Sequence, residues 1–313
     1  MGKGKQVIDQ SLFLCHLCAS VVSSVGCRLS HHRDTENTEV AQRRFHMNHD
    51  ESNDREREYP ACLSVVVPVF NEEATLGTVI RKLLSVPWLL EIIIVDDCST
   101  DGTGEQAREL AGLHEQVRLI RHERNSGKTA ALRTGFALTT GQIVIVQDAD
   151  LEYDPAEIYG VIRPILEGHA DVVFGSRFLV RRAARVLYFY HYLANKFLTY
   201  LSNSLTNLNM TDVETGYKAF RGEIIRNMRI VSSGFGFEVE VAAKIAKLKV
   251  AIYEVPISYY GRTYAEGKKI VFMDGVMALW LVIRFNLFCS LRASFHQIPE
   301  MEKKVMSDER QEV

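Results

Sequence analysis

The stretch from Leu63 to Val69, which reads Leu-Ser-Val-Val-Val-Pro-Val, begins the part of the chain that has a regular secondary-structure pattern. Its β-branched residues predict a strand, and its continuous apolar character predicts that both faces of the strand are buried. Asn71-Glu72-Glu73 and a helical pattern to about Ser85 come next. We therefore expect a buried strand that leads into a helix.

The same step from strand to helix recurs further along the chain. Four more apolar runs follow, namely Glu91 to Val95, Val117 to Arg121, Ile143 to Gln147 and Asp171 to Gly175. Alternating strands and helices predict an α/β fold with a single, mainly parallel sheet sandwiched by helices. Ligands of such sheets bind beyond the carboxyl ends of the strands. The acidic clusters Asp96-Asp97 and Asp148-Ala149-Asp150 both follow a predicted strand, so we expect them at that edge.

Composition divides the chain into a folded region and flanking segments. Residues 30–59 contain almost no apolar side chains, so they bury too little surface to offset the entropy lost on ordering. We expect a disordered extension over residues 1–60, with Met47 as an alternative start of the chain, followed by a folded domain over 61–265. An amphipathic segment over 266–295 and a polar tail over 296–313 complete the predicted organisation.

Two later segments have the composition of helices that lie on a membrane surface. Residues Val180 to Leu208 alternate aromatic, aliphatic and basic side chains, which indicates one or two amphipathic helices. Residues Ile270 to Ser290 are rich in Met, Trp, Leu and Phe but are interrupted by Asp274 and Arg284. Since a spanning helix needs about 20 uninterrupted apolar residues, we expect an interfacial helix here.

Net charge, cysteine spacing and an incomplete P-loop motif argue against three other classes of protein. A formal net charge of -2 argues against a nucleic-acid-binding protein, which would carry a strongly basic face. Cys15 and Cys18 form a CxxC pair, but His31 and His32 do not complete a zinc-binding spacing. Asn125-Ser126-Gly127-Lys128-Thr129 is similar to the end of a P-loop, but His122 stands where that motif requires glycine, so an NTPase is a poor fit.

The segment from Gln147 to Glu152 has the composition of a divalent-cation site. Asp148 and Asp150 are separated by one residue at a strand end, and Glu152 supplies a third carboxylate. Mg²⁺ prefers such oxygen ligands and is commonly bound by one or two carboxylates together with substrate phosphates. A solvated acidic turn is the alternative interpretation. The position after a buried strand favours the metal site.

Several further residues could contact a nucleotide or a phosphate. Asp97 could accept hydrogen bonds from a base or ribose, although Asx turns and helix caps also use such residues. Lys128, at a turn that opens a helix, could lie near a ribose or phosphate. The basic candidates for phosphate binding are Arg177, Arg221, Arg262, Lys268 and Lys269. The segment from Gly261 to Lys269 could form a loop that closes over a diphosphate.

Six motifs in the same order resemble the family-2 inverting glycosyltransferases, and in particular their dolichyl-phosphate mannosyltransferase-like branch of polyprenyl-phosphate hexosyltransferases. These motifs are Val67 to Glu73, Val95 to Ser99, Asn125 to Lys128, Asp148 to Glu152, Gly175 to Arg177 and Arg262 to Lys268. The resemblance implies a GT-A-type (Rossmann-like) catalytic domain over residues 61–265. This sequence has Glu152 where the branch often has Gln, and Gly267 where it often has Ser.

The resemblance also implies roles for individual residues. A nucleotide-sugar site would be formed by Pro68, Phe70, Glu72, Val95, Asp97, Ser126, Gly127, Lys128, Asp148, Ala149 and Asp150. Mg²⁺ or Mn²⁺ would be held by Asp148, Asp150 and Glu152. The residues expected to carry catalysis are Asp150, Arg177, Arg262 and Lys268.

These roles predict transfer of a hexose, mannose or glucose, from a sugar nucleotide of the GDP-mannose or UDP-glucose type to a polyprenyl phosphate. An anionic phosphate acceptor needs no strong base, so the enzyme mainly positions the substrates and neutralises their charge. We expect a cytoplasmic protein that is peripheral at the cytoplasmic face of a membrane. A family-2 enzyme with a soluble or polysaccharide acceptor is the alternative. A catalytically inactive binding protein is disfavoured because all three carboxylates are present.

Overall fold

The computed structural model describes residues 60–179, 185, 188–234, 236–262 and 272–299. The predicted disordered extension, the alternative start at Met47, the CxxC pair, Lys268, Lys269 and most of the polar tail therefore lie outside the described residues.

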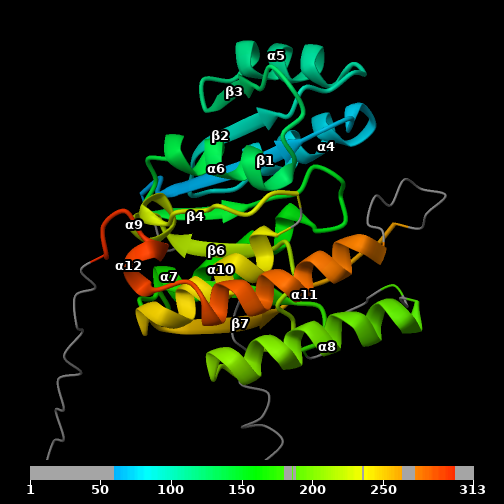
Figure 1. The fold of residues 1–313 in the computed structure, drawn as a ribbon. Helices are drawn as coiled ribbons and strands as arrows, with labels where there is room; N and C mark the ends of the chain where they lie inside the picture. Colours follow the sequence, from blue (N-terminus) through cyan, green and yellow to red (C-terminus); the bar gives the residue numbers. More distant parts are fainter. Residues whose placement is uncertain (1–59, 180–184, 186–187, 235, 263–271, 300–313) are drawn as a thin grey trace, which may run out of the picture. The chain divides into compact units, whose positions relative to one another are not determined.

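One mixed sheet forms the centre of the described part, in the strand order β3-β2-β1-β4-β6-β5-β7 (Figure 1). Its strands are β1 (Leu63–Val69), β2 (Leu89–Asp96), β3 (Val117–Arg121), β4 (Ile143–Val146), β5 (Val172–Ser176), β6 (Lys218–Arg221) and β7 (Ile252–Pro256). All strand pairs are parallel except the two made by β6, which is antiparallel to β4 and β5. The predicted α/β class with a mainly parallel sheet is confirmed.

Helices cover both faces of the sheet. They are α4 (Glu73–Leu84), α5 (Thr103–Leu113), α6 (Lys128–Leu138), the 3-10 turn η2 (Pro155–Glu157), α7 (Ile158–Leu166), α8 (Phe189–Thr206), α9 (Gly222–Asn227), α10 (Phe237–Leu248), α11 (Phe272–Leu287) and α12 (Leu291–Ser294). Alternation along β1 separates two cores: Val65 and Val67 pack with α4, whereas Val66 packs with Leu132 of α6. The central strands are therefore buried on both faces, as their β-branched runs predicted, whereas the edge strands β3 and β7 are partly exposed.

Sharp turns follow the three central parallel strands. Asn71 after β1, Cys98 after β2 and Leu151 after β4 all have positive φ angles, of 54°, 64° and 61°. Residues other than glycine rarely adopt this left-handed backbone conformation, and those that do are concentrated at functional sites. These turns direct the residues that follow β1, β2 and β4 over one edge of the sheet.

Helices α8, α10 and α11 form a layer on one side of the sheet, in which α11 contacts both α8 and α10 (Figure 1). Leu281, Val282 and Phe285 of α11 are buried in the core that α10 shares. Among the described residues, none of the helices has both the length and the apolar character that a membrane crossing needs.

Candidate active site

An acidic cluster lies at the carboxyl ends of β1 and β4, and Arg262 bonds to it. The Nη2 atom of Arg262 lies 3.0 Å from Asp150 Oδ2 and 3.1 Å from Glu72 Oε1, and its Nη1 atom lies 3.2 Å from Glu72 Oε2. These residues are separated by up to 190 positions in the chain. The fold therefore brings together three residues that the sequence placed in the site.

Glu152 anchors the segment that carries Arg262. Its Oε1 atom accepts a hydrogen bond from the backbone N–H of Arg262 at 2.7 Å, and its Oε2 atom accepts one from the Tyr259 hydroxyl at 2.8 Å. Both carboxylate oxygens are thus engaged by residues 259–262. The role of Glu152 as a metal ligand remains a prediction.

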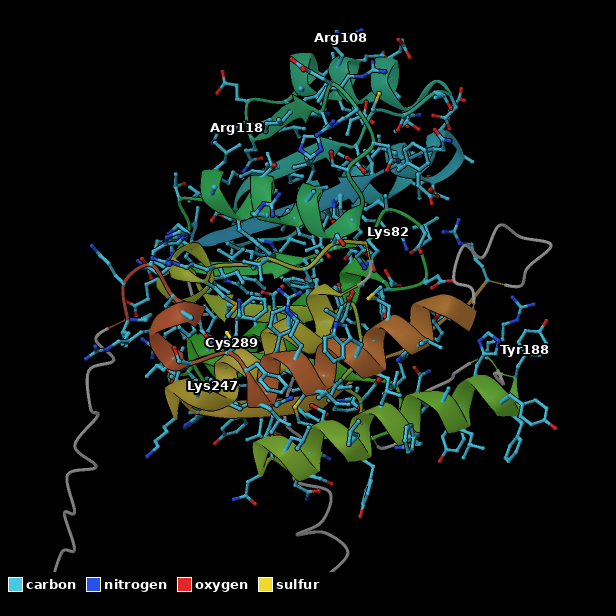
Figure 2. The ribbon with its side chains drawn as sticks, in the orientation of Figure 1. Lys82, Arg108, Arg118, Tyr188, Lys247 and Cys289 are labelled. Atoms are coloured by element: carbon cyan, nitrogen blue, oxygen red, sulfur yellow. The ribbon has the colours of Figure 1, made fainter. Side chains whose placement is uncertain are left out.

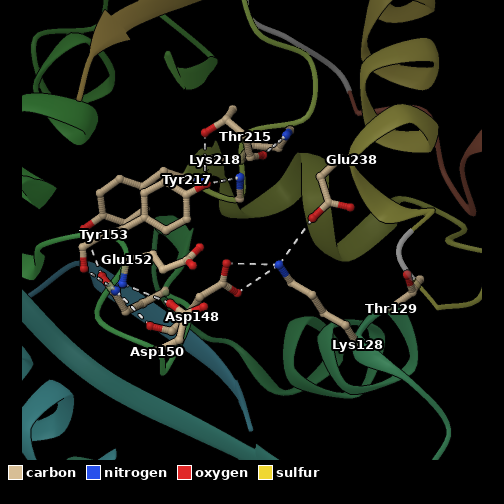
Figure 3. A network of polar contacts seen from close by, with 12 residues as sticks. Lys128, Thr129, Asp148, Asp150, Glu152, Tyr153, Thr215, Tyr217, Lys218 and Glu238 are labelled. Carbon is tan, nitrogen blue, oxygen red and sulfur yellow. Dashed lines mark hydrogen bonds and ion pairs between the residues drawn. The ribbon is translucent and has the colours of Figure 1, made fainter. Parts of the chain in front are cut away.

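Lys128 forms a second centre beside the acidic cluster (Figure 3). Its Nζ atom lies 2.9 Å from Asp148 Oδ1 and 3.3 Å from Glu238 Oε1, so one ammonium group bridges two carboxylates. Lys128 is the first residue of α6, after Gly127 with a φ of 87°, while Glu238 lies in the first turn of α10. The sequence suggested Lys128 as a site residue but gave no indication of Glu238.

Burial and like charge disturb the protonation of these groups. Burial first, and then the negative charges of Asp148 and Glu152, raise the pKa of Asp150 to about 7. Burial alone would lower the pKa of Lys128, but Asp148 and Glu238 raise it on balance. The site therefore holds more negative charge than its own cations compensate, which is the condition under which a further cation binds.

Asp97 has a structural role that its sequence context did not reveal. Its carboxylate accepts hydrogen bonds from the backbone N–H groups of Ser126 and Gly127, at 2.9 Å and 2.6 Å, and lies 2.7 Å from Nδ1 of His122. Asp97 thereby fixes the turn that precedes Lys128. Its contact with a base or ribose remains a prediction.

Arg177 lies after β5 and is almost enclosed. Its guanidinium makes two bonds to Asp212, of 2.6 Å and 2.7 Å, and lies 5.2 Å from the centre of the Tyr259 ring. Asp212 is fully buried. Such a bidentate pair holds the guanidinium in a fixed orientation, and a phosphate contact for Arg177 remains a prediction.

Four more predicted residues lie around the same edge. Arg221 does not, because it pairs with Ile143 at the start of β4 and lies 2.8 Å from Asp171 at the opposite edge. Val95 and Ala149 are buried, and their side chains pack in the core, so a nucleotide could reach only their backbone. Pro68 and Phe70 at the end of β1 are partly exposed. Pro68 lies beyond the last residue of β1 that pairs with β4, so its missing N–H costs no hydrogen bond on that side.

The loop of Asp148 is supported by aromatic side chains that sequence reasoning did not identify. Tyr153 and Tyr217 stack with ring centres 5.2 Å apart. The Tyr217 hydroxyl donates to Gln147 Oε1 at 2.9 Å, and Gln147 Nε2 donates to the carbonyl of Asp148 at 3.0 Å. Aromatic residues in this part of the sequence had no distinguishing spacing, so only the tertiary contacts reveal the support.

Gly216 lies so close to Asp148 that a larger residue should disturb the site. A Cβ atom at position 216 would lie 2.5 Å from Asp148 Oδ2 and 3.2 Å from the Tyr153 ring. We expect Gly216→Ala to displace the carboxylate of Asp148 and to lower the rate of the predicted hexose transfer roughly tenfold to a hundredfold. Gly160→Ala is the matched control, because a Cβ there meets nothing within 4 Å. Equal steady-state rates for the two variants would contradict this expectation.

Glu214 should make stability depend on pH. Burial first, and then the charge of Glu238, raise its pKa to about 7 from an ordinary value of 4.5. As pH rises between these values, the unfolded chain loses this proton while the folded protein keeps it, so wild-type stability falls. Glu214→Gln has no titrating carboxyl at this position, so its stability does not fall in this way. Its free energy of unfolding, relative to wild type, should therefore rise by roughly 2 kcal/mol between about pH 5 and pH 8. Urea unfolding at both pH values measures this, and a pH-independent difference would contradict it.

Comparison with known proteins identifies the class to which this fold and site belong. The sequence profile of Glycosyl transferase family 2 matches residues 64–229, which is more than half of the chain. This chain therefore belongs to glycosyl transferase family 2, and the resemblance found in its motifs is confirmed.

Several curated relatives belong to the branch that the motifs indicated. The chain is 27% identical over 212 residues to the dodecaprenyl-phosphate galacturonate synthase of Rhizobium johnstonii, covering 66% of this chain and 61% of that protein. It is 30% identical over 210 residues to the dolichol-phosphate mannosyltransferase of Pyrococcus furiosus, covering 66% and 58%. The undecaprenyl-phosphate mannosyltransferase of Micrococcus luteus is 29% identical over 213 residues, covering 65% and 85%. The chain thus spans less than two thirds of the first two relatives.

Solved structures support the fold. Glucosyl-3-phosphoglycerate synthase from Mycobacterium tuberculosis, in complex with UDP, has a TM-score of 0.57 and 21% identity over 72% of this chain and 80% of that one. The same enzyme with Mn²⁺, UDP and glucosyl-3-phosphoglycerate has a TM-score of 0.54 at 21% identity. At this identity the likeness shows the shared GT-A-type fold alone.

Proposed function

We propose that this protein transfers a hexose from a sugar nucleotide to a polyprenyl phosphate and inverts the anomeric centre. The observation that carries this proposal is the pair Asp148 and Asp150 at the end of β4, with Lys128 and Arg262 bonded to their carboxylates. Carboxylates for a cation and basic groups for phosphates are what a nucleotide diphosphate requires. The names of the curated relatives, which all include a polyprenyl or dolichol phosphate, favour a lipid phosphate as acceptor.

A divalent ion fits the residues present. The two carboxylates of Asp148 and Asp150 suit Mg²⁺ or Mn²⁺. Burial, and then the negative charges of Asp148 and Glu152, raise the pKa of Asp150, and a bound cation would favour its charged form. Among the described residues, no three or more His, Cys, Asp or Glu side chains are grouped so that they could hold a metal ion by themselves. When bound, the ion would neutralise charge on the departing diphosphate.

The chain's own residues position the substrates and balance charge. An oxygen of the acceptor phosphate forms a bond to the anomeric carbon, while the bond from that carbon to the nucleoside diphosphate breaks. The electron pair leaves with the diphosphate, whose negative charge Arg262 and Lys128 stabilise. The acceptor phosphate is already anionic, so no side chain has to remove a proton. A single displacement of this kind inverts the configuration of the sugar.

A donor and acceptor panel tests the proposal. Full-length protein with Mg²⁺ or Mn²⁺ and a short polyprenyl phosphate is incubated with GDP-mannose, UDP-glucose and other sugar nucleotides, and lipid products are identified by mass spectrometry. We expect a lipid-phosphate sugar from one donor. Transfer only to soluble or polysaccharide acceptors would overturn the lipid assignment. Hydrolysis of the donor without any transfer would overturn the assignment as a transferase.

The described helices α8 and α11 provide a surface for a lipid substrate. Both expose large apolar side chains, where an ordinary surface helix is polar. On or beside α8 these are Tyr188, Phe189, Tyr190, Leu193, Phe197 and Tyr200, and on or beside α11 they are Val276, Met277, Trp280, Leu287 and Phe288. Figure 2 shows Tyr188 by α8, at the end of the molecule away from Arg108 on α5. We propose that this apolar surface lies on the cytoplasmic face of a membrane.

Charged substitutions on the apolar surface should weaken membrane binding. Phe197 and Trp280 are 55% and 54% exposed, so replacing both with Glu should leave the core intact. Losing two aromatic groups that would insert into the bilayer is expected to lower partition into vesicles roughly tenfold or more. Flotation with vesicles of neutral and anionic phospholipid measures the effect. Leu113→Glu is the control, since Leu113 is 68% exposed on α5. Equal flotation of the double variant and wild type would refute the assignment.

A further inference from the structure

Glu238 is a buried carboxylate for which the proposed reaction has no use. The residue is 5% exposed, and its Oε2 atom is enclosed without a hydrogen-bond partner among the described residues. Its other oxygen, Oε1, lies 3.3 Å from Lys128 Nζ. A buried charged oxygen without a partner is costly to the folded protein. Such a group in a native structure therefore calls for a ligand or another explanation.

The fold holds Glu238 next to the donor-binding residues. The carbonyl of Gly234 accepts hydrogen bonds from the backbone N–H and the hydroxyl of Thr129, at 3.1 Å and 2.8 Å, which ties the start of α10 to the start of α6. Lys128 then bridges Glu238 and Asp148 (Figure 3). The sugar of a nucleotide donor is bonded directly to the diphosphate, so a diphosphate at Asp148 and Asp150 places the sugar beside them. The Nζ atom of Lys128 contacts both Glu238 and Asp148, so Glu238 lies close to the expected position of the sugar.

The surroundings of Glu238 carry further negative charge. Glu214 has an enclosed Oε1 atom that also lacks a partner among the described residues, and the charge of Glu238 contributes to its raised pKa. Lys128, Lys218 and Arg177 are the cations that face this pair. Each is already engaged elsewhere: Lys128 bonds to Asp148 at 2.9 Å, Lys218 donates to the carbonyl of Val213 at 3.1 Å, and Arg177 bonds to Asp212 at 2.6 Å. The region can therefore accept hydrogen bonds from hydroxyl groups, but it offers little compensation to an additional anion.

We infer that Glu238 determines sugar specificity: its carboxylate accepts hydrogen bonds from hydroxyls of the donor sugar and selects neutral hexoses over hexuronic acids. The inference rests on the proposed function. A hydroxyl supplies the donor that the carboxylate lacks, and the broad terminal torsion of Glu lets either oxygen face the sugar. A hexuronate would bring a third carboxylate towards Glu238 and Glu214, and that repulsion is strong where water is excluded. Relatives named for mannose and for galacturonate show that the distinction exists among similar proteins.

Binding of matched sugar nucleotides to the full-length protein tests this inference without a lipid acceptor. Calorimetry in Mg²⁺ compares UDP-glucose with UDP-glucuronate and GDP-mannose with GDP-mannuronate, and UDP and GDP alone report on the nucleotide site. Wild type should prefer the neutral sugar by roughly tenfold or more. Glu238→Gln should reduce that preference at least about fivefold, with less than a twofold effect on UDP or GDP. Glu238→Asp keeps the charge, so it should retain discrimination against the uronate while binding the neutral sugar more weakly.

The controls separate this inference from the proposed function. Glu223→Gln makes the same change of charge at an exposed position on α9 and should leave the preference unaltered. An unchanged preference in Glu238→Gln, a wild-type preference for the uronate, or no binding of any of the four donors would overturn the inference. Selective binding of neutral donors without any lipid product would instead overturn the proposed transfer and leave the specificity role standing.

Discussion

Replacing Asp150 by Asn is expected to lower the rate of sugar transfer roughly a thousandfold while the protein remains folded. Asp150 lies 3.0 Å from Arg262 and accepts the backbone N–H of Glu152 at 3.1 Å. Asn keeps the size of the side chain and can still accept that hydrogen bond, but it removes the charge that a divalent ion needs. Since burial and the neighbouring Asp148 and Glu152 oppose ionisation of Asp150, losing its charge should not destabilise the fold.

Two measurements check the Asp150 prediction. Steady-state transfer rates across a Mg²⁺ titration should show a large loss that added ion only partly restores. Thermal unfolding should give a melting temperature no lower than that of wild type. Glu109→Gln, at an exposed position on α5, is the control for a lost carboxylate and should retain the full rate. A rate for Asp150→Asn within about tenfold of wild type would contradict a role in catalysis.

Replacing Arg262 by Ala should have the second largest effect, a loss of about a hundredfold in the rate of transfer. The guanidinium contacts Asp150 and both oxygens of Glu72, so its removal takes positive charge away from these two carboxylates and leaves Lys128 as the one proposed side-chain cation for the departing diphosphate. Arg262→Lys keeps the charge but cannot reproduce the forked contacts, and it should retain an intermediate rate.

The control for Arg262 is Arg108→Ala, because Arg108 is exposed on α5 at the far end of the described part (Figure 2). Comparing kcat and KM separates two roles. A loss confined to KM would mean that Arg262 serves donor binding alone, whereas a loss in kcat supports stabilisation of the leaving group. An Arg262→Ala enzyme within about threefold of wild type in both constants would remove Arg262 from the proposed mechanism.

Most of the strands that the sequence predicted have continuous apolar runs. β1, β2, β4 and β5 were recognisable because a strand buried on both faces consists of β-branched and aliphatic residues, whereas β3 was predicted from Val117, Leu119 and Ile120 although its two arginines are exposed. β6 (Lys218–Arg221) was missed, since its four residues include two basic ones and Lys218 is fully buried. Helix α10 was missed for a similar reason, because Glu238, Glu240 and Lys244 are buried within it. Buried charges break the periodicity from which elements are predicted, and only their tertiary partners explain them.

The chain's sequence by itself determined the family, the parallel sheet and the acidic residues at its edge, because strand periodicity and motifs are local properties. Only the tertiary structure decided how these residues are paired. It bonded Asp97 to the turn that precedes Lys128, engaged Glu152 with Tyr259 and Arg262, and brought Glu238 to Lys128 across 110 positions. Pairing of charges depends on distance and burial in space, which no local pattern records.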